Sequence, residues 1–508
     1  MQLDNFNINM ENTNFLILFY CITSVLFIFY QYQFNNDVNL SSLLFISVLL
    51  LVLGSFIFFF YSKNYKIGHE NLYKLCFVII VCFGLFNVFL TPIADVCDET
   101  EHFWRAEITS TGQFNPEYVS IPNTNDSGYQ TISSLTNLYH LTGNTVFNNS
   151  WGTQPIDYNV GYVSSAFSQN PFYGYLAQAF GIDIAKFLNL SNIWMLWLGR
   201  ICNLLLYAGF ASLAIKKAPI FKVPLLVVAC LPLAVYQGAS MSIDAFVNGS
   251  SLLPIGYFLY LYKSEDLTWK NVSIFFLLSI FGGLTKVTYL ALSFLIFLVP
   301  RANFKTKNDY IFSRLGILIV IFVSYCWSSF YATPNLLNSW RGPYFMEHNV
   351  NASGQIHYLL HNNLGLLNFI GQLPFTLFTV IEGYFSFANL PAYGSKLLAY
   401  LYIVFFFLVS LFYPVKVKFD RFRKIGVFLI FLLTYFGIIF IQYLTWCSVA
   451  YHKIVGIFGR YFIPLLSLIP LFLSINVKES NKSIDLSVLV CIFFFLASSI
   501  LLTVFQYY

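Results

Sequence analysis

The chain has 508 residues, of which 58% are hydrophobic and only 10% are charged. A soluble domain usually carries about a quarter of charged residues, so this chain has more apolar surface than one water-soluble core can bury. The composition excludes a soluble enzyme, a nucleic-acid-binding protein and a disordered chain, and the net charge of +5 matters less than where the charges lie. It predicts an all-α polytopic integral membrane protein.

Apolar segments of the length that a membrane helix needs, about 20 residues, recur along the chain. Two neighbouring segments, 271–285 and 287–300, are short for two full crossings. The predicted spans are 14–32, 40–61, 73–91, 192–214, 223–240, 243–262, 271–285, 287–300, 310–331, 396–414, 425–446, 457–475 and 484–505.

Lys and Arg gather in a few loops, and these set the orientation because cytoplasmic loops of membrane proteins are enriched in basic residues. One topology puts all of them in the cytoplasm: about thirteen spans, with the N-terminus inside and the C-terminus outside. It requires 271–300 to cross twice, as a short hairpin. It also requires the apolar segment 365–382 to lie in the outer interface. The basic loops are 63–74, 216–222, 263–270, 301–314, 416–424 and 478–482.

Two long polar segments, 92–191 and 332–395, then lie outside the cytoplasmic membrane, because they are too polar for lipid and too long to be turns. We expect three parts in the chain. Residues 1–72 hold two additional N-terminal transmembrane helices, 73–475 form a core with both outer segments, and 476–508 form a last transmembrane helix.

The densest group of titratable residues follows the third span. Asp98 and Glu99 stand directly after it, and Asp98, His102 and Arg105 fall at i, i+4 and i+7, on one face of a helix. Carboxylates here could act as a general base or bind a divalent cation. The alternative is an acidic first turn of a surface helix, which the helix dipole favours. Spacing alone does not separate the two.

Further charged residues lie where charge is costly or unusual. Arg200 lies inside the fourth span, where an Arg is usually paired or functional, with snorkelling as the alternative. Asp244 stands where the fifth span turns into the sixth and would also serve as a helix N-cap. Lys286, at the tip of the hairpin, is either an interface anchor or a ligand for lipid phosphate. Arg460 and Tyr461 open the twelfth span, where a snorkelling Arg is again the alternative.

Taken in order, these motifs resemble those of a known family. Over residues 80–475 the chain is similar to a bacterial family of predicted multi-pass membrane proteins of unassigned function, which is related to the GT-C glycosyltransferases. One departure is Cys97, which stands where a Pro commonly precedes the Asp-Glu pair. The motifs are Asp98-Glu99-x-x-His102-Phe-x-x-Ala106, Arg200-x-x-Asn203, Ser242-x-Asp244-Ala, Thr285-Lys286 and Gly459-Arg460-Tyr461-Phe-x-Pro464.

The resemblance implies a GT-C-like fold and an inverting enzyme of the outer membrane face. It would move a sugar from a polyprenyl-phosphate-linked donor to a cell-envelope glycan or a lipid-linked acceptor. Asp98 matches the catalytic carboxylate best and Glu99 second. No metal ligand set is implied, and Asp98 with Glu99 is the one place where a divalent cation could bind. Substrate or lipid phosphate would be bound by His102, Arg105, Arg200, Asp244, Lys286, Arg460 and Tyr461.

Other functions remain as alternatives: a flippase or transporter of lipid-linked glycans, or a polymerase or ligase of the same chemistry. A transporter predicts charges spread through mid-membrane positions and an internal repeat. Here the charges cluster at outer helix ends, and the sequence has no evident repeat. A structural or receptor protein would leave Arg200, Asp244 and Lys286 unexplained.

Overall fold

The computed structural model describes residues 10–65, 70–384, 395–417 and 419–508. In this part of the chain, nine helices are long and apolar enough, by length and composition, to cross a membrane. A predominantly helical membrane protein is therefore confirmed, whereas the thirteen spans and their orientation stay predictions. Lys66 and Lys418 of the basic loops, and residues 385–394 of the second outer segment, lie outside the described residues.

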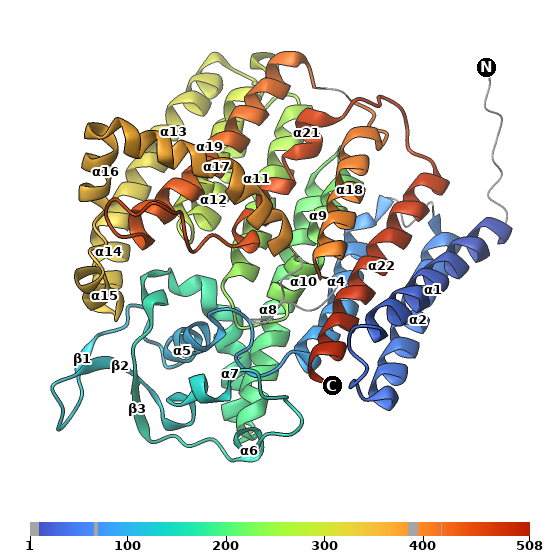
Figure 1. Ribbon diagram of the computed structural model, residues 1–508. Coiled ribbons are helices and arrows are strands. Elements are labelled where there is room, and N and C mark those ends of the chain that lie inside the picture. Colours follow the sequence, from blue (N-terminus) through green and yellow to red (C-terminus); the bar gives the residue numbers. More distant parts are fainter. Residues whose placement is uncertain (1–9, 66–69, 385–394, 418) are drawn as a thin grey trace.

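The two N-terminal helices, α1 (Met10–Tyr32) and α2 (Leu40–Lys63), lie at one side of the bundle (Figure 1). Both pack against the last helix, α22 (Lys482–Tyr507), which also contacts α4 (Leu72–Leu90). With neighbours on both sides, α22 is the most buried of the nine candidate spans. A helix that is apolar on all faces is expected in such a place.

The centre of the bundle is α8 (Asn192–Lys217), which packs against α4, α7 (Leu176–Phe187) and α11 (Asp244–Lys263). Glycine permits the closest approach, because a Cβ on Gly181 would lie 2.3 Å from the carbonyl oxygen of Leu198. The other elements of the bundle include α12 (Trp269–Gly283), η5 (Val287–Leu298), η6 (Arg301–Asn303), α13 (Lys307–Trp327), η7 (Ser328–Ala332), α18 (Ser395–Phe412) and α19 (Arg421–Trp446).

The short hairpin predicted over 271–300 corresponds to α12 and η5. The 12 residues of η5 are wound as a 3₁₀-helix and the 15 residues of α12 as an α-helix. A 3₁₀-helix rises about 2.0 Å per residue and an α-helix about 1.5 Å, so the two arms reach about equally far. Lys286 lies at the turn that joins them.

Two of the predicted spans are broken helices. Segment 223–240 divides into α9 (Lys222–Ala229) and α10 (Pro232–Gly238). Segment 457–475 divides into η8 (Gly459–Phe462), α20 (Ile463–Leu466) and α21 (Ile469–Leu473). Each of α10, α20 and α21 has a proline in its first two positions. Proline suits a helix start and interrupts a helix that would otherwise continue.

The first outer segment contains a small sheet, so the all-helical prediction is incomplete. Strands β1 (Val119–Ser120), β2 (Ser127–Ile132) and β3 (Val160–Val163) pair antiparallel in the order β1-β2-β3. Short Val-, Tyr- and Thr-bearing runs bounded by Asn and Asp are typical of such strands. The helical elements around the sheet are α5 (Glu99–Ser110), η1 (Ser133–Leu135), η2 (Leu138–Leu141), α6 (Ser150–Thr153), η3 (Ala166–Gln169) and η4 (Phe172–Tyr175).

The second outer segment is helical and joins the first, because α14 packs on η3. The interfacial helix predicted over 365–382 corresponds to α17, which slants across the bundle in Figure 1. By length and composition α17 is itself long and apolar enough to cross a membrane. The helices of the second outer segment are α14 (Thr333–Asn338), α15 (Arg341–Glu347), α16 (Ala352–His361) and α17 (Asn363–Gly383).

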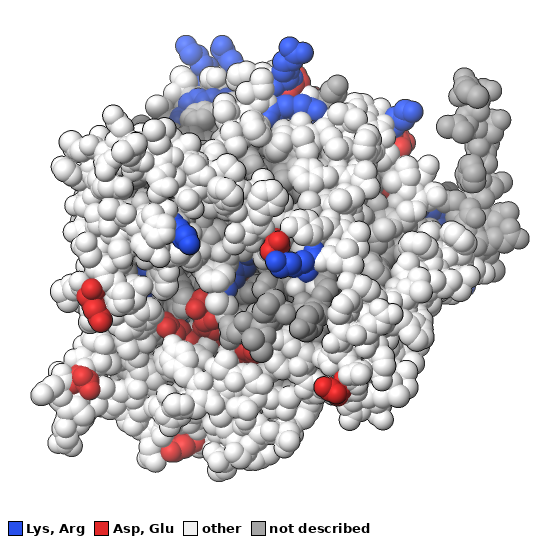
Figure 2. Space-filling model, viewed as in Figure 1, with Lys and Arg blue, Asp and Glu red and all other residues white. Residues whose placement is uncertain are grey.

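Charge is distributed unevenly along the long axis of the bundle. In Figure 2 most of the visible Lys and Arg side chains gather at the top, at the end of the bundle far from the sheet, and most of the visible Asp and Glu side chains lie in the lower half. The lower half of the same view contains the first outer segment (Figure 1). The two ends of the bundle therefore differ in charge.

Candidate functional site

Helix α5 is polar in sequence but buried along almost its whole length. Glu99, Arg105 and Glu107 are each 1% exposed or less. Buried ionised groups are stable only when they are paired or hydrogen-bonded. The partners of each charge therefore show which ones the protein already uses and which ones are available to a ligand. Glu107, for example, is bound by Lys186 at 2.9 Å and by the hydroxyl of Thr131.

Glu99 forms a buried, bidentate ion pair with Arg200. Arg200 donates from Nε to Oε1 of Glu99 at 2.8 Å and from Nη2 to Oε2 at 2.7 Å. The remaining donors of the guanidinium bind the carbonyl oxygens at the end of α4, those of Val88, Thr91 and Pro92. This pair joins α4, α5 and α8, and it occupies both carboxylate oxygens of Glu99.

Asp98 points elsewhere, because its backbone is left-handed, with φ of +65°. Its side chain is 41% exposed, and its Oδ2 accepts a hydrogen bond from Nη2 of Arg460 at 2.7 Å. The buried guanidinium of Arg460 also reaches Oδ2 of Asp244 through Nε, at 2.9 Å. Arg460 thus bridges two carboxylates. Since its contact uses Oδ2, Oδ1 of Asp98 has no partner among the described residues.

Lys286 lies beside this bridge. Its Nζ is 3.4 Å from the centre of the Tyr461 ring, and the guanidinium carbon of Arg460 is 5.0 Å from the same ring. Within the described residues Lys286 forms no ion pair. Burial of the ammonium lowers the pKa of Lys286 to about 7. Such a cation gains most from a bound anion.

His102 and Arg105 lie further along α5 and share a neighbour, Tyr175. The hydroxyl of Tyr175 is 2.8 Å from Nδ1 of His102, and Arg105 lies over the Tyr175 ring. Burial lowers the pKa of His102 to about 4, so the imidazole is neutral at pH 7. The donors of Arg105 reach Thr109 and the carbonyl oxygen of Phe114. His102 is close enough to Asp98, Asp244 and Arg460 for their charges to act on it, whereas Arg105 is also hydrogen-bonded with Tyr331.

An apolar groove has Val287 and Thr288, the two residues after Lys286 in the sequence, among its lining residues. It has a volume of about 520 Å³ and lies between η5, α13 and α19. The hairpin predicted to line a lipid groove therefore contributes η5, whereas α17 contributes none of the lining residues. The groove is lined by Val287, Thr288, Leu290, Ala291, Ser293, Phe294, Ile317, Val320, Ile321, Ser324, Tyr325, Ser328, Leu433, Gly437 and Ile441.

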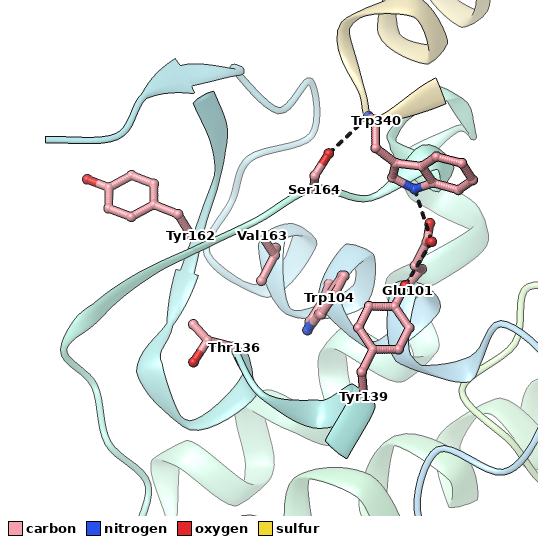
Figure 3. Close-up of a pocket in the computed structure, with 8 residues that line it drawn as sticks. All are labelled: Glu101, Trp104, Thr136, Tyr139, Tyr162, Val163, Ser164 and Trp340. Atoms are coloured by element: carbon pink, nitrogen blue, oxygen red, sulfur yellow. Dashed lines mark hydrogen bonds between the residues drawn. The ribbon is translucent and has the colours of Figure 1, made fainter. Parts of the chain in front are cut away.

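The structure also reveals a pocket that the sequence analysis did not identify. It has a volume of about 440 Å³ and lies where the two outer segments meet (Figure 3). Glu101 of α5 and Trp340 of the second outer segment both line it, together with Trp104 and Tyr139. Glu101 lies in the first turn of α5, three residues after Asp98, but nothing in the sequence connects it with Trp340.

Metal binding has little support in this arrangement. The described residues contain no group of three or more His, Cys, Asp or Glu side chains that could hold a metal ion. Arg200 takes both oxygens of Glu99, and Arg460 takes one oxygen of Asp98. The arrangement thus combines an exposed carboxylate, a buried guanidinium and an ammonium whose residue directly precedes the groove residue Val287 in the sequence.

Comparison with known proteins places the chain in a family. A family model described as "Predicted membrane protein (DUF2142)" matches residues 81–469. The matched stretch begins within α4, ends at the first residue of α21 and contains Asp98, Asp244, Lys286 and Arg460. No curated protein and no solved structure matches the chain. Since the model matches more than half of its length, the chain belongs to this family of predicted membrane proteins.

Proposed function

We propose that the protein is an inverting membrane glycosyltransferase of the GT-C type. It moves a sugar from a polyprenyl-phosphate-linked donor to a cell-envelope glycan or a lipid-linked acceptor, with Asp98 as the catalytic base. The observation that carries the proposal is the exposed carboxylate of Asp98, held by the buried Arg460 beside Lys286, which forms no ion pair within the described residues and directly precedes the groove residue Val287 in the sequence. The ordered motifs resemble a family of predicted membrane proteins that is related to the GT-C glycosyltransferases, and this resemblance also motivates the proposal.

The groove and Lys286 together suit a lipid phosphate. Isoprenoid chains are apolar, so they gain free energy by lying along Leu, Ile and Phe side chains between η5 and α19. A phosphate at the end of such a chain would meet the Lys286 ammonium, which has no carboxylate partner among the described residues. A water-soluble polar substrate would gain little free energy from contact with an apolar groove at this place.

The reaction needs one base and one cation. Oδ1 of Asp98, which has no partner among the described residues, takes the proton of an acceptor hydroxyl as the hydroxyl oxygen forms a bond to the anomeric carbon. The bond from the anomeric carbon to the phosphate oxygen breaks, and the lipid phosphate leaves with the bonding electrons. Lys286 stabilises the negative charge that develops on this leaving oxygen. A single displacement inverts the anomeric configuration.

The separation of charge along the bundle supports an outer location for this chemistry. Basic loops are enriched on the cytoplasmic side of membrane proteins. The first outer segment, to which Asp98 belongs, lies at the end of the bundle away from most of the visible Lys and Arg (Figures 1 and 2). On this basis the proposed active site faces the extracytoplasmic side of the cytoplasmic membrane.

A genetic complementation experiment tests the proposal. A deletion strain is complemented with the wild type, with Asp98→Asn, or with Asp126→Asn, whose side chain is an exposed carboxylate of the same outer segment. Surface glycans are compared by mass spectrometry after equal expression is verified. We expect the deletion and Asp98→Asn to lack the same sugar substituent and Asp126→Asn to restore it. Restoration by Asp98→Asn, or accumulation of complete lipid-linked glycan inside the deletion strain, would reject the proposal, and the second result would favour a transporter.

A further inference from the structure

The pocket between the outer segments has the dimensions of a small-molecule site. Its volume of about 440 Å³ falls within the range of about 300–1,000 Å³ that is usual for such sites. Residues from α5, from β3 and its flank, and from the second outer segment converge on it (Figure 3). It is lined by Glu101, Trp104, Thr136, Tyr139, Tyr162, Val163, Ser164 and Trp340.

Glu101 supplies a buried carboxylate that is held by neutral donors. Its side chain accepts hydrogen bonds from the hydroxyl of Tyr139 at 3.0 Å, the indole N–H of Trp340 at 3.1 Å and the backbone N–H of Ala166 at 2.9 Å. A carboxylate offers about four lone-pair sites, so one is left for a ligand donor. Within the described residues no cation pairs with Glu101.

Arg341, the residue after Trp340, is close enough to Glu101 for the two charges to interact, but within the described residues it forms no ion pair with Glu101. Its Nη2 donates to the carbonyl oxygen of Thr445, and its guanidinium lies 4.1 Å from the centre of the Trp446 ring. It does not line the pocket. The residues that line the pocket include the carboxylate of Glu101 but no Lys, Arg or His, so the pocket suits a neutral ligand better than a phosphate or an acidic sugar.

Aromatic rings form the rest of the recognition surface. Trp104 and Tyr139 meet edge to face at 5.1 Å, and Figure 3 shows Tyr139 and Trp340 on either side of Glu101. Their polar ends bind Glu101 or the backbone, so the rings offer apolar contact with a fixed orientation. Thr136 and Ser164 add hydroxyl groups to the lining, and the Ser164 hydroxyl lies beside Trp340, whose backbone N–H donates to it at 3.0 Å. A neutral pyranose matches this combination, because its C–H faces are apolar and its hydroxyls are hydrogen-bond donors and acceptors.

We propose that this pocket binds a neutral hexopyranose unit of the acceptor. Glu101 lies three residues after Asp98, about one turn of helix α5 from the proposed base. A sugar held there would present the next unit of its chain toward Asp98. The assignment of the sugar to the acceptor rests on the proposed function, whereas the binding of a neutral hexopyranose rests on the pocket alone.

Ligand-observed NMR on the full-length protein in lipid nanodiscs tests the inference. The probes are the methyl pyranosides of glucose, galactose, mannose and N-acetylglucosamine, and saturation transfer from the protein to each is recorded. We expect at least one to receive saturation from the wild type. Tyr139→Ala should lower this signal by about threefold or more, because it removes one ring contact. Glu101→Gln should lower it as well, since it removes the charged acceptor at nearly constant volume.

The matched control is Tyr158→Ala. Tyr158 and Tyr139 are tyrosines of the same outer segment with similar exposure, 51% and 54%, but Tyr158 does not line the pocket. Tyr158→Ala should bind the sugar as the wild type does, and all variants should elute as the same species in size-exclusion chromatography. If no pyranoside receives saturation, if Tyr139→Ala binds equally well, or if choline chloride displaces the sugar and binds more tightly, the inference is wrong.

Asp98→Asn separates this inference from the proposed function. We expect this variant to bind the pyranoside normally, because Asp98 does not line the pocket. Sugar binding together with full glycan restoration by Asp98→Asn would refute the transferase while leaving the pocket assignment in place. Loss of the sugar substituent with Asp98→Asn, but no sugar binding by the wild type, would refute the pocket alone.

Discussion

Replacing Arg200 should destabilise the protein more than any exposed arginine does. The guanidinium is fully buried and makes five hydrogen bonds, two to Glu99 and three to the carbonyl oxygens that end α4. Arg200→Met leaves the carboxylate of Glu99 buried without its cation. Breaking a buried pair by removing one partner costs about 3–5 kcal/mol, so we expect a loss of that size in the free energy of unfolding.

The double variant makes the prediction specific. Glu99→Gln combined with Arg200→Met removes both charges, so it should be at least as stable as Arg200→Met alone. The free energies of unfolding are measured by titration with SDS in mixed micelles. Arg421→Met, at an exposed position, is the control and should change stability by less than about 0.5 kcal/mol. A loss below about 1 kcal/mol for Arg200→Met, or losses that simply add in the double variant, would refute the structural role of this pair.

Further predictions concern the cation Lys286, the titration of His102 and the close contact at Gly181. Lys286→Met should abolish binding of undecaprenyl phosphate, measured by native mass spectrometry, and Lys286→Arg should retain it. Binding by the wild type should weaken from pH 7 to pH 9, because the pKa of Lys286 is about 7 and the side chain is therefore neutral at pH 9. His102 has a pKa of about 4 when folded and about 6.5 when unfolded, so the unfolded state binds an extra proton between these values and stability falls by up to about 3 kcal/mol from pH 6.5 to pH 4. Gly181→Ala should cost about 1–3 kcal/mol, because its Cβ would lie 2.3 Å from a backbone oxygen of α8.

Each of these three predictions has a result that would contradict it. If Lys286→Met binds undecaprenyl phosphate as well as the wild type does, the lipid phosphate does not bind at Lys286. For His102, the variant His102→Gln should have a shallower dependence of stability on pH than the wild type; equal slopes would contradict the assignment. Gly209 has no atom within 4 Å of an added Cβ, so Gly209→Ala should be tolerated. Equal effects at Gly181 and Gly209 would contradict the close packing of α7 on α8.

The membrane character of the chain can be predicted from its sequence, because the length of its apolar segments is enough to identify membrane helices. Most predicted spans correspond to helices, and the short hairpin at 271–300 appears as α12 and η5. The breaks in 223–240 and 457–475 were not predicted, although Pro232, Pro464 and Pro470 mark them. Hydropathy averages over about 19 residues and does not register a single lost backbone donor.

The site could be predicted only in part. Charged residues at helix ends are conspicuous in an apolar chain, and four of them, Asp98, Asp244, Lys286 and Arg460, lie together in the structure. The different roles of the neighbours Asp98 and Glu99 are not visible in sequence. They follow from the left-handed backbone of Asp98, which sends one carboxylate to Arg460 and the other to Arg200.

The pocket around Glu101 was inaccessible to sequence reasoning for a different reason. Trp340 is 239 residues away from Glu101 along the chain, and the two outer segments meet through the packing of α14 on η3 and through hydrogen bonds of Trp340 with Glu101 and Ser164. An aromatic residue in an outer segment is unremarkable by itself in a chain with 20% aromatic residues. Its role becomes apparent only when its indole N–H meets a buried carboxylate.

The central claim is that Asp98 is the base of a sugar transfer from lipid phosphate. Its most direct test uses the purified protein in nanodiscs with lipid-linked sugars extracted from the membranes of the source organism. Release of polyprenyl phosphate is followed by mass spectrometry for the wild type, Asp98→Asn and the control Asp126→Asn. General-base catalysis contributes about 10²–10⁴-fold, so Asp98→Asn should slow release by at least about 100-fold while Asp126→Asn keeps the wild-type rate. Release by Asp98→Asn within about threefold of the wild type would contradict the claim.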